Sequence, residues 1–228
     1  MDSEYRDQEE LYRIKPSDYY GVARTEMLPY VPADGKLILE VGCGSGAFGR
    51  ALKQRRPETV VWGIEPDVAA GQVAAQTLDR VIPGTFSSVL SELATERFDV
   101  ICLNDVIEHI ADPYQVLREC KDLLTSDGMV VASIPNVLFF YEIAKILITQ
   151  DWKYEDCGVL DNTHLRFFTK KSIIRMFDEC GYEILKIEGI NAFAGRKFRF
   201  FNAVSLGHIK DWKYVQFAVQ ARVRKIAR

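Results

Sequence analysis

Three scarcities narrow the classes of protein to which this chain of 228 residues can belong. Neither charge is in large excess, because 29 lysines and arginines face 32 aspartates and glutamates, so a general nucleic-acid binder is not expected. The five cysteines never stand in C-x-x-C spacing, which argues against a thiolate metal site or a disulfide framework. The most apolar segment, 137–148, contains Glu142 and Lys145 and is too short to span a bilayer.

Two further signals are missing from the chain. The first residues are acidic and lack the apolar h-region of a signal peptide, so we expect a cytoplasmic protein with reduced thiols. No Gly-Lys-Ser/Thr follows the glycine-rich segment near residue 44, which excludes a Walker A phosphate loop.

The basic residues are unevenly distributed along the chain. From Asn191 onward Asp211 is the only acid, against nine lysines and arginines. This basic C-terminal region is either a solvated surface or a patch that contacts anionic lipid headgroups or a phosphorylated acceptor.

Apolar runs alternate with helical patterns, which predicts an α/β fold with a doubly wound parallel sheet. The predicted strands are 37–41, 60–64, 98–103, 129–134, 183–188 and 215–221, with a weaker one near 80–82. The predicted helices are 47–55, 68–78, 113–124, 138–148 and 170–180. In such sheets ligands bind beyond the carboxyl ends of the strands, where the strand order reverses.

A glycine-rich loop follows the first predicted strand. Glycine at every second position of 42–46 lets a ligand approach the backbone closely. Residues 44–49 also satisfy G-x-G-x-x-G, so a nicotinamide dinucleotide fits the pattern. Glu40 favours another ligand, because a carboxylate there repels a pyrophosphate and attracts the ammonium and sulfonium of S-adenosylmethionine. Glu65, at the end of the second strand, can accept both ribose hydroxyls of an adenosine.

Two segments carry a resemblance to a known family. Residues 40–46, Glu-Val-Gly-Cys-Gly-Ser-Gly, resemble motif I of the class I S-adenosylmethionine-dependent methyltransferases, and 98–101 followed by 104–109 resembles their fourth-strand motif. The resemblance covers about 35–188 and implies a mostly parallel, seven-stranded Rossmann-like sheet whose last strand is antiparallel. It implies a single methyltransferase domain over 1–228, with a lid in 1–30, a cofactor-binding half in 31–135 and an acceptor-binding half in 136–228. Two long connections, near 150–168 and 190–213, are expected to recognise the acceptor.

The same resemblance implies a set of cofactor contacts for S-adenosylmethionine. The glycine loop would line the methionine and ribose, the end of the second strand would hold the ribose, and the end of the fourth would border the methionine. Phe86 would flank adenine by stacking or through its backbone N–H, and polar residues of the lid would fold over the ligand. The expected contacts are Tyr20, Arg24, Glu40, Gly42, Cys43, Gly44, Gly46, Glu65, Pro66, Thr85, Phe86, Asn104 and Asp105.

Three hypotheses compete for the catalytic residues. In the first, His109 or His164 is the general base that takes a proton from a hydroxyl acceptor. In the second, Asp105, Glu108, His109 and His164 bind a divalent cation, because Asp105-x-x-Glu108-His109 would share one face of a helical turn. A similar arrangement occurs in small-RNA 3′-terminal methyltransferases and ubiquinone-pathway O-methyltransferases. In the third, these residues only order their loops.

The acceptor is predicted from a narrower resemblance. Residues 158–169 resemble a segment of bacterial methyltransferases associated with polysaccharide and other glycan biosynthesis. We therefore expect O-methylation of a sugar or glycan-precursor hydroxyl, on a nucleotide-linked or lipid-linked molecule, with peripheral membrane contact through the basic C-terminal region. The alternatives are a metal-dependent O-methyltransferase for a quinone-like aromatic or an RNA terminus, a non-catalytic cofactor-binding partner protein, and a nicotinamide dehydrogenase.

Overall fold

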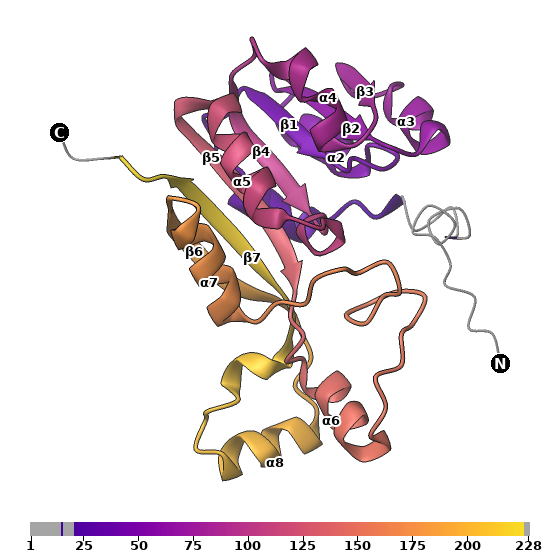
Figure 1. Ribbon diagram of the computed structural model, residues 1–228, viewed down its shortest axis with the longest axis vertical. Helices are drawn as coiled ribbons and strands as arrows, with labels where there is room; N and C mark the ends of the chain where they lie inside the picture. Colours follow the sequence, from indigo (N-terminus) through magenta and orange to yellow (C-terminus); the bar gives the residue numbers. More distant parts are fainter. Residues whose placement is uncertain (1–14, 16–20, 226–228) are drawn as a thin grey trace.

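A computed structural model describes Lys15 and residues 21–225, and Tyr20 therefore lies outside the described residues. Seven strands form one sheet in the order β3-β2-β1-β4-β5-β7-β6 (Figure 1). Strand β7 runs antiparallel to both β5 and β6, whereas the pairs from β3 to β5 are parallel. The predicted doubly wound sheet with an antiparallel last strand is confirmed. The strands are β1 Leu37–Val41, β2 Val60–Glu65, β3 Arg80–Pro83, β4 Phe98–Asn104, β5 Leu124–Pro135, β6 Tyr182–Ala192 and β7 Tyr214–Val223.

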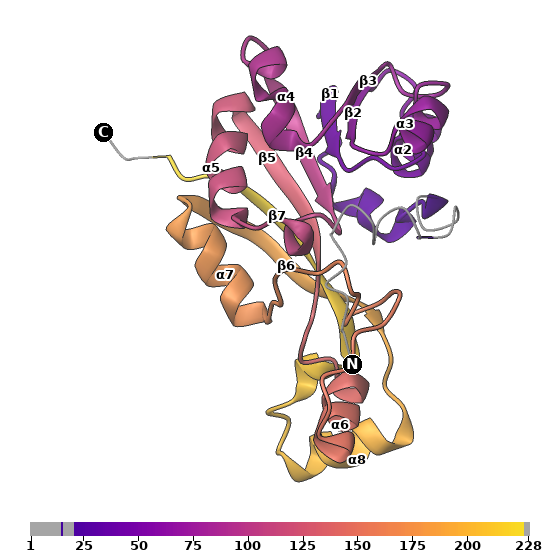
Figure 2. The same cartoon turned by 45° about the vertical axis from the view of Figure 1, so that its right-hand side comes forward.

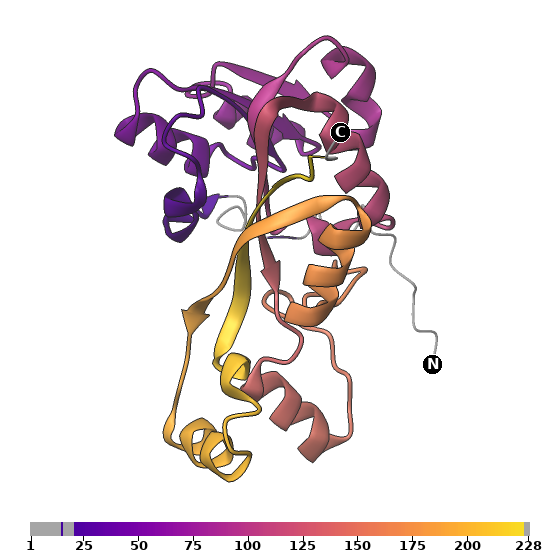
Figure 3. The same cartoon turned by 90° about the vertical axis from the view of Figure 1, so that its left-hand side faces the viewer.

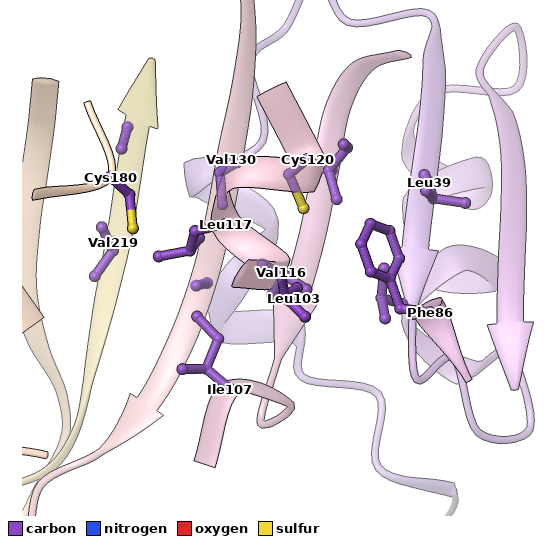
Figure 4. Packing of buried hydrophobic residues seen from close by; sticks show 14 of the residues in the cluster. Leu39, Phe86, Leu103, Ile107, Val116, Leu117, Cys120, Val130, Cys180 and Val219 are labelled. Carbon is purple, nitrogen blue, oxygen red and sulfur yellow. The ribbon is translucent and has the colours of Figure 1, made fainter. Parts of the chain in front are cut away.

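Helices cover both faces of the sheet. The α-helices are α2 Ala47–Arg55, α3 Val68–Ala74, α4 Phe86–Leu93, α5 Pro113–Leu123, α6 Phe140–Thr149, α7 Lys170–Glu179 and α8 Arg196–Val204. Short 3-10 helices are η2 Thr25–Tyr30, η3 Ile107–His109 and η4 Lys210–Lys213. Helices α4, α5 and α7 share the larger core on one face, and η2, α2 and α3 share the second core on the other. Figure 4 shows α5 side chains such as Leu117 packed against strand residues such as Val130.

The order of the strands reverses between β1 and β4. The chain leaves β1 for β2 and β3, then returns to pair β4 with the other edge of β1. In sheets of this kind the ligand-binding crevice lies beyond the carboxyl ends of the two strands at the switch point, here β1 and β4. Both the glycine loop and the segment 104–109 start at this point.

Helices α6 and α8 form a separate lobe, which we call the α6–α8 lobe. It lies beyond the end toward which β5 runs, away from the helices that cover the sheet (Figures 1, 2 and 3). Phe140 of α6 joins the two helices, with its ring centroid 5.5 Å from that of Phe198 and 5.7 Å from that of Phe201. Among the described helices, none is long and apolar enough to cross a membrane.

The structure departs from the predicted elements in three places. Helix α4 was not predicted, although Thr85 caps it by accepting a hydrogen bond from the Ser88 amide. Residues 190–213 are not one long loop, because α8 and η4 lie within them. Strand β5 starts at Leu124, five residues before the prediction, because residues 125–128 (Thr-Ser-Asp-Gly) separate Leu124 from the apolar run.

Candidate active site

The glycine loop leaves β1 in a backbone conformation that residues other than glycine rarely adopt. Gly42, Gly44 and Gly46 all have positive φ, and a Cβ on Gly42 would lie 3.0 Å from Cγ2 of Val106. A Cβ on Gly46 would lie 3.0 Å from Cα of Ala74. The spacing of the glycines therefore follows from backbone geometry and close packing, and it leaves the loop open to a ligand.

Glu65 connects the glycine loop to the end of β2 through hydrogen bonds. Its carboxylate accepts hydrogen bonds from the Gly44 amide at 2.7 Å and from the Asp67 amide at 2.9 Å. The side chain is buried, and desolvation raises its pKa in spite of these bonds. A carboxylate oxygen can accept more than one hydrogen bond, so Glu65 keeps acceptor capacity for ribose hydroxyls.

Glu40 is buried more deeply than the sequence suggested. Its Oε2 atom has no hydrogen-bond partner among the described residues and would lie 3.1 Å from a Cβ on Gly49, in the first turn of α2. Burial raises the pKa of Glu40 to about 8, with a smaller contribution from the charge of Glu65. The carboxylate therefore lies against α2, and its attraction for the cationic groups of the cofactor stays a prediction.

The end of β4 presents polar groups to the same crevice. The side-chain amide of Asn104 is buried, and neither its nitrogen nor its oxygen has a partner in the described part of the chain. Asp105 has φ of 53° and receives hydrogen bonds from Ser133 Oγ at 2.9 Å and Gln216 Nε2 at 2.5 Å. Arg24, a predicted lid residue, forms an ion pair with Asp105. Asn104 is thus the group left available for a ligand.

The remaining predicted cofactor residues have simpler surroundings. Cys43 is buried, and burial raises the pKa of its thiol. Thr85 caps α4, and Pro66 is exposed between Glu65 and α3. The prediction that Phe86 stacks on adenine is wrong for this conformation, because the ring packs in the larger core beside Leu39 (Figure 4). Its backbone N–H remains the predicted contact.

Glu108, His109 and His164 form a cluster near this crevice. Their candidate ligand atoms all lie within 4.8 Å of one another, and His164 Nε2 is 3.9 Å from Glu108 Oε1. The two imidazole centroids are 4.7 Å apart. His164 comes from the loop between α6 and α7, and that loop is fixed because the amides of Leu165 and Arg166 donate to the Glu108 carbonyl.

Burial controls the charge states in the cluster. Desolvation raises the pKa of Glu108 to about 8 and lowers the pKa of His109 to about 4. Desolvation also lowers the pKa of His164. At neutral pH both imidazoles are therefore uncharged, and the glutamate is largely protonated.

Backbone carbonyls fix the orientation of both rings. His164 Nδ1 lies 3.1 Å from the Val159 carbonyl, and His109 Nδ1 lies 3.2 Å from the Thr163 carbonyl. A carbonyl oxygen can only accept, so each Nδ1 carries the proton and Nε2 carries the lone pair. In this tautomer Nε2 is the atom through which each ring can ligate a metal ion.

Asp105 is not part of this cluster, which corrects the predicted set of four ligands. The prediction placed Asp105, Glu108 and His109 on one face of a helical turn. The positive φ of Asp105 and the non-helical φ of −121° at Val106 break that turn, and η3 begins only at Ile107. The carboxylate of Asp105 faces Arg24 and Gln216 instead.

A buried ion pair behind the cluster was missed. Lys15 Nζ lies 2.7 and 2.8 Å from the two carboxylate oxygens of Asp161, and both side chains are almost fully buried. Asp161 also accepts hydrogen bonds from the amide and the hydroxyl of Thr163. No local pattern signals a contact between residues 146 positions apart.

Comparisons with known proteins show the family to which the chain belongs. A family model described as a methyltransferase domain matches residues 15–187. A ubiquinone biosynthesis O-methyltransferase of Neisseria meningitidis is 27% identical over 173 residues, which cover 68% of this chain and 67% of the relative. The enzyme of the same name from Caulobacter sp. is 34% identical over 137 residues, which cover 54% of each chain.

Solved structures share the fold at low sequence identity. A SAM-dependent methyltransferase from Archaeoglobus fulgidus superposes with a TM-score of 0.65 and 16% identity, over 90% of this chain and 94% of the other. The plantazolicin methyltransferase BpumL, solved with SAH, has a TM-score of 0.60 and 17% identity, over 93% of this chain and 87% of the other. The fold and the glycine loop are those of a SAM-dependent methyltransferase. This chain belongs to the methyltransferase domain family, which confirms the predicted enzyme class and its S-adenosylmethionine cofactor.

Proposed function

We propose that the chain is an O-methyltransferase for a small acceptor with two neighbouring oxygens, and that Glu108, His109 and His164 hold a divalent cation beside it. Glu108 carries this proposal. Both of its carboxylate oxygens are buried and have no hydrogen-bond partner among the described residues. A buried carboxyl group without partners is costly, and a cation on it removes that cost.

The donor set fits a divalent metal ion. Two neutral imidazoles and a carboxylate suit Mn²⁺ or Zn²⁺, and Mg²⁺ accepts such a site when water completes its coordination. The carbonyl contacts of Val159 and Thr163 supply the second layer that orients the two rings. Binding of the ion would displace the proton of Glu108, whose pKa of about 8 keeps it protonated in the metal-free protein.

Different residues would bind the cofactor and the cation during methyl transfer. When bound, S-adenosylmethionine supplies an electrophilic methyl group and the cation supplies Lewis acidity that lowers the pKa of a hydroxyl. Glu65 would hold the ribose and Asn104 the methionine end, which fixes the methyl group for in-line attack. His109 would act as a ligand, because a group with a pKa of about 4 is a weak proton acceptor at neutral pH.

The relatives support a quinol-like acceptor. Those reported above are named ubiquinone biosynthesis O-methyltransferases. The family model matches residues 15–187, which include the segments that hold the cluster. A catechol or similar ring presents two adjacent oxygens to one cation. The predicted sugar or glycan hydroxyl stays a prediction, because nothing in the cluster selects it.

Tritiated methyl transfer to a soluble catechol tests the proposal. Enzyme freed of metal with EDTA should be inactive, and Mg²⁺, Mn²⁺ or Zn²⁺ should restore activity at least tenfold. Full activity in EDTA on a nucleotide sugar, with none on the catechol, would establish the general-base hypothesis instead. Binding of S-adenosylhomocysteine with no transfer to any acceptor would establish a non-catalytic partner protein.

A further inference from the structure

The α6–α8 lobe carries a surface that neither the sheet nor the candidate active site uses. Several large apolar side chains on it are mostly exposed, including Phe200 at 64%, Val204 at 66% and Leu206 at 87%. Leu147 and Ile148, at the end of α6, are exposed at 72% and 81%. Large apolar side chains gathered at one end of a molecule mark an interaction surface.

Helix α8 arranges these side chains in a regular way. Lys197, Phe200, Phe201 and Val204 have the i, i+3, i+4, i+7 spacing that places them on one face. Phe198 is buried and packs with Phe201 on Phe140 of α6, which leaves Phe200 and Val204 of this face outward. The exposed apolar face is therefore held outward by the packing of the helix.

The cations around this face have no acidic partners. Arg196, Lys197 and Arg199 are exposed, and no ion pair joins them to any described residue. No acid occurs between residues 191 and 210. The basic residues at the end of β7 differ, because Arg222 pairs with Glu183, Arg224 with Asp178 and Lys225 with Asp127. Among the described residues, cations without an acidic partner therefore lie on α8, whereas the three at the end of β7 are paired.

The lobe also lies at the functional end of the sheet. Strands β4 and β5 run toward it, and β5 leads through residues 136–139 into α6 (Figures 1 and 3). The crevice beyond β1 and β4 therefore opens at the end of the sheet that carries α6 and α8.

We propose that the exposed face of α8, with the end of α6, docks on an anionic phospholipid bilayer. An apolar face flanked by lysine and arginine is what an interfacial helix presents to acidic headgroups. A second copy of the chain fits less well, because a symmetric contact would place the patch against itself and bring like charges together. Docking in this orientation turns the active-site end of the sheet toward the membrane.

Vesicle flotation of the full chain tests this surface without cofactor, metal or acceptor, so its outcome is independent of the proposed function. We expect binding to phosphatidylglycerol-containing vesicles at least tenfold stronger than to pure phosphatidylcholine, and weaker in high salt. Arg196→Gln/Lys197→Gln/Arg199→Gln should reduce binding on the order of 100-fold, because each cation near an acidic surface contributes a factor of about 5. Phe200→Ser/Val204→Ser/Leu206→Ser should reduce it at least tenfold.

Two matched triple variants serve as controls. Arg222→Gln/Arg224→Gln/Lys225→Gln removes the same charge from the other end of the sheet, and Val73→Ser/Ile174→Ser/Leu185→Ser removes apolar groups of intermediate exposure elsewhere. Both should bind like the wild type. The proposal would be overturned if the wild-type chain failed to float with anionic vesicles, or if the control variants lost as much vesicle binding as the α8 variants. It would also be overturned if the chain formed a stable dimer that the apolar α8 variant abolished, while vesicles did not bind.

Discussion

The predicted cofactor site and the proposed acceptor site of this molecule are assembled in different ways. We call the surroundings of Glu65 and the glycine loop the cofactor half, and the surroundings of Glu108, His109 and His164 the acceptor half, whatever their residue numbers. In the first, Glu65 bonds the amides of Gly44 and Asp67, which lie 21 and 2 positions away. In the second, His109 contacts Thr163 across 54 positions, and Lys15 reaches Asp161 across 146. The first half is a local motif that a sequence displays, whereas the second depends on how distant loops pack.

Loss of the Glu108 charge should have the largest effect and should separate the two halves. Glu108→Gln keeps the shape of the side chain but removes the anionic ligand, so we expect cation-dependent methyl transfer to fall by roughly 10²-fold or more. Calorimetry should still find S-adenosylhomocysteine affinity within about twofold of the wild type. Glu179→Gln, an exposed change on α7, is the matched control. Retained activity in Glu108→Gln would contradict a role for a divalent cation in methyl transfer.

Loss of the buried Lys15 charge should destabilise the acceptor half. Lys15→Met leaves the Asp161 carboxylate buried without its cation, which costs about 3–5 kcal/mol in comparable pairs. Urea unfolding measures this cost, and the double variant Lys15→Met/Asp161→Asn should recover part of it because both charges are then gone. If the single variant lost less than about 1 kcal/mol, the pair would not hold the histidine loop in place.

Loss of the Glu65 charge should act on the cofactor half alone. Glu65→Gln replaces an acceptor oxygen with an NH₂ group, which cannot accept from both amides and ribose hydroxyls. We expect S-adenosylhomocysteine affinity to fall about 10- to 100-fold, since hydrogen bonds to charged groups contribute about 1.5–3 kcal/mol. Mn²⁺ binding should be unchanged. Weakened metal binding in this variant would mean that the halves are coupled.

The last prediction concerns the pH dependence of stability through Glu40. Its pKa is raised from 4.5 to about 8 in the folded chain, so the folded state binds a proton that the unfolded state releases. This contribution is complete below pH 4.5 and is lost as pH rises through 8. Urea unfolding from pH 5 to 9 should therefore show wild-type stability falling relative to Glu40→Gln, by on the order of a few kcal/mol. Parallel pH curves for the two proteins would place the carboxylate in a more polar environment.

The antiparallel last strand was implied by the resemblance to the methyltransferase family, whereas the parallel sheet and the glycine loop could be predicted because those features are local. The run of apolar strands and the glycines at 42, 44 and 46 impose them directly. The cluster was predicted only in part, because Glu108 and His109 are neighbours and His164 was singled out by its loop. Asp105 was wrongly included, since nothing in its spacing reveals a left-handed residue. The Lys15–Asp161 pair depends on tertiary packing alone.

Titration of the metal-free chain with Mn²⁺, followed by electron paramagnetic resonance, tests the central claim most directly. The account predicts one saturable site per chain at pH 8, abolished in His164→Ala and retained in His208→Ala, which removes an exposed histidine of the α8–η4 connection. Absence of saturable binding in the wild type, or equal binding by both variants, would contradict a divalent-cation site at Glu108, His109 and His164.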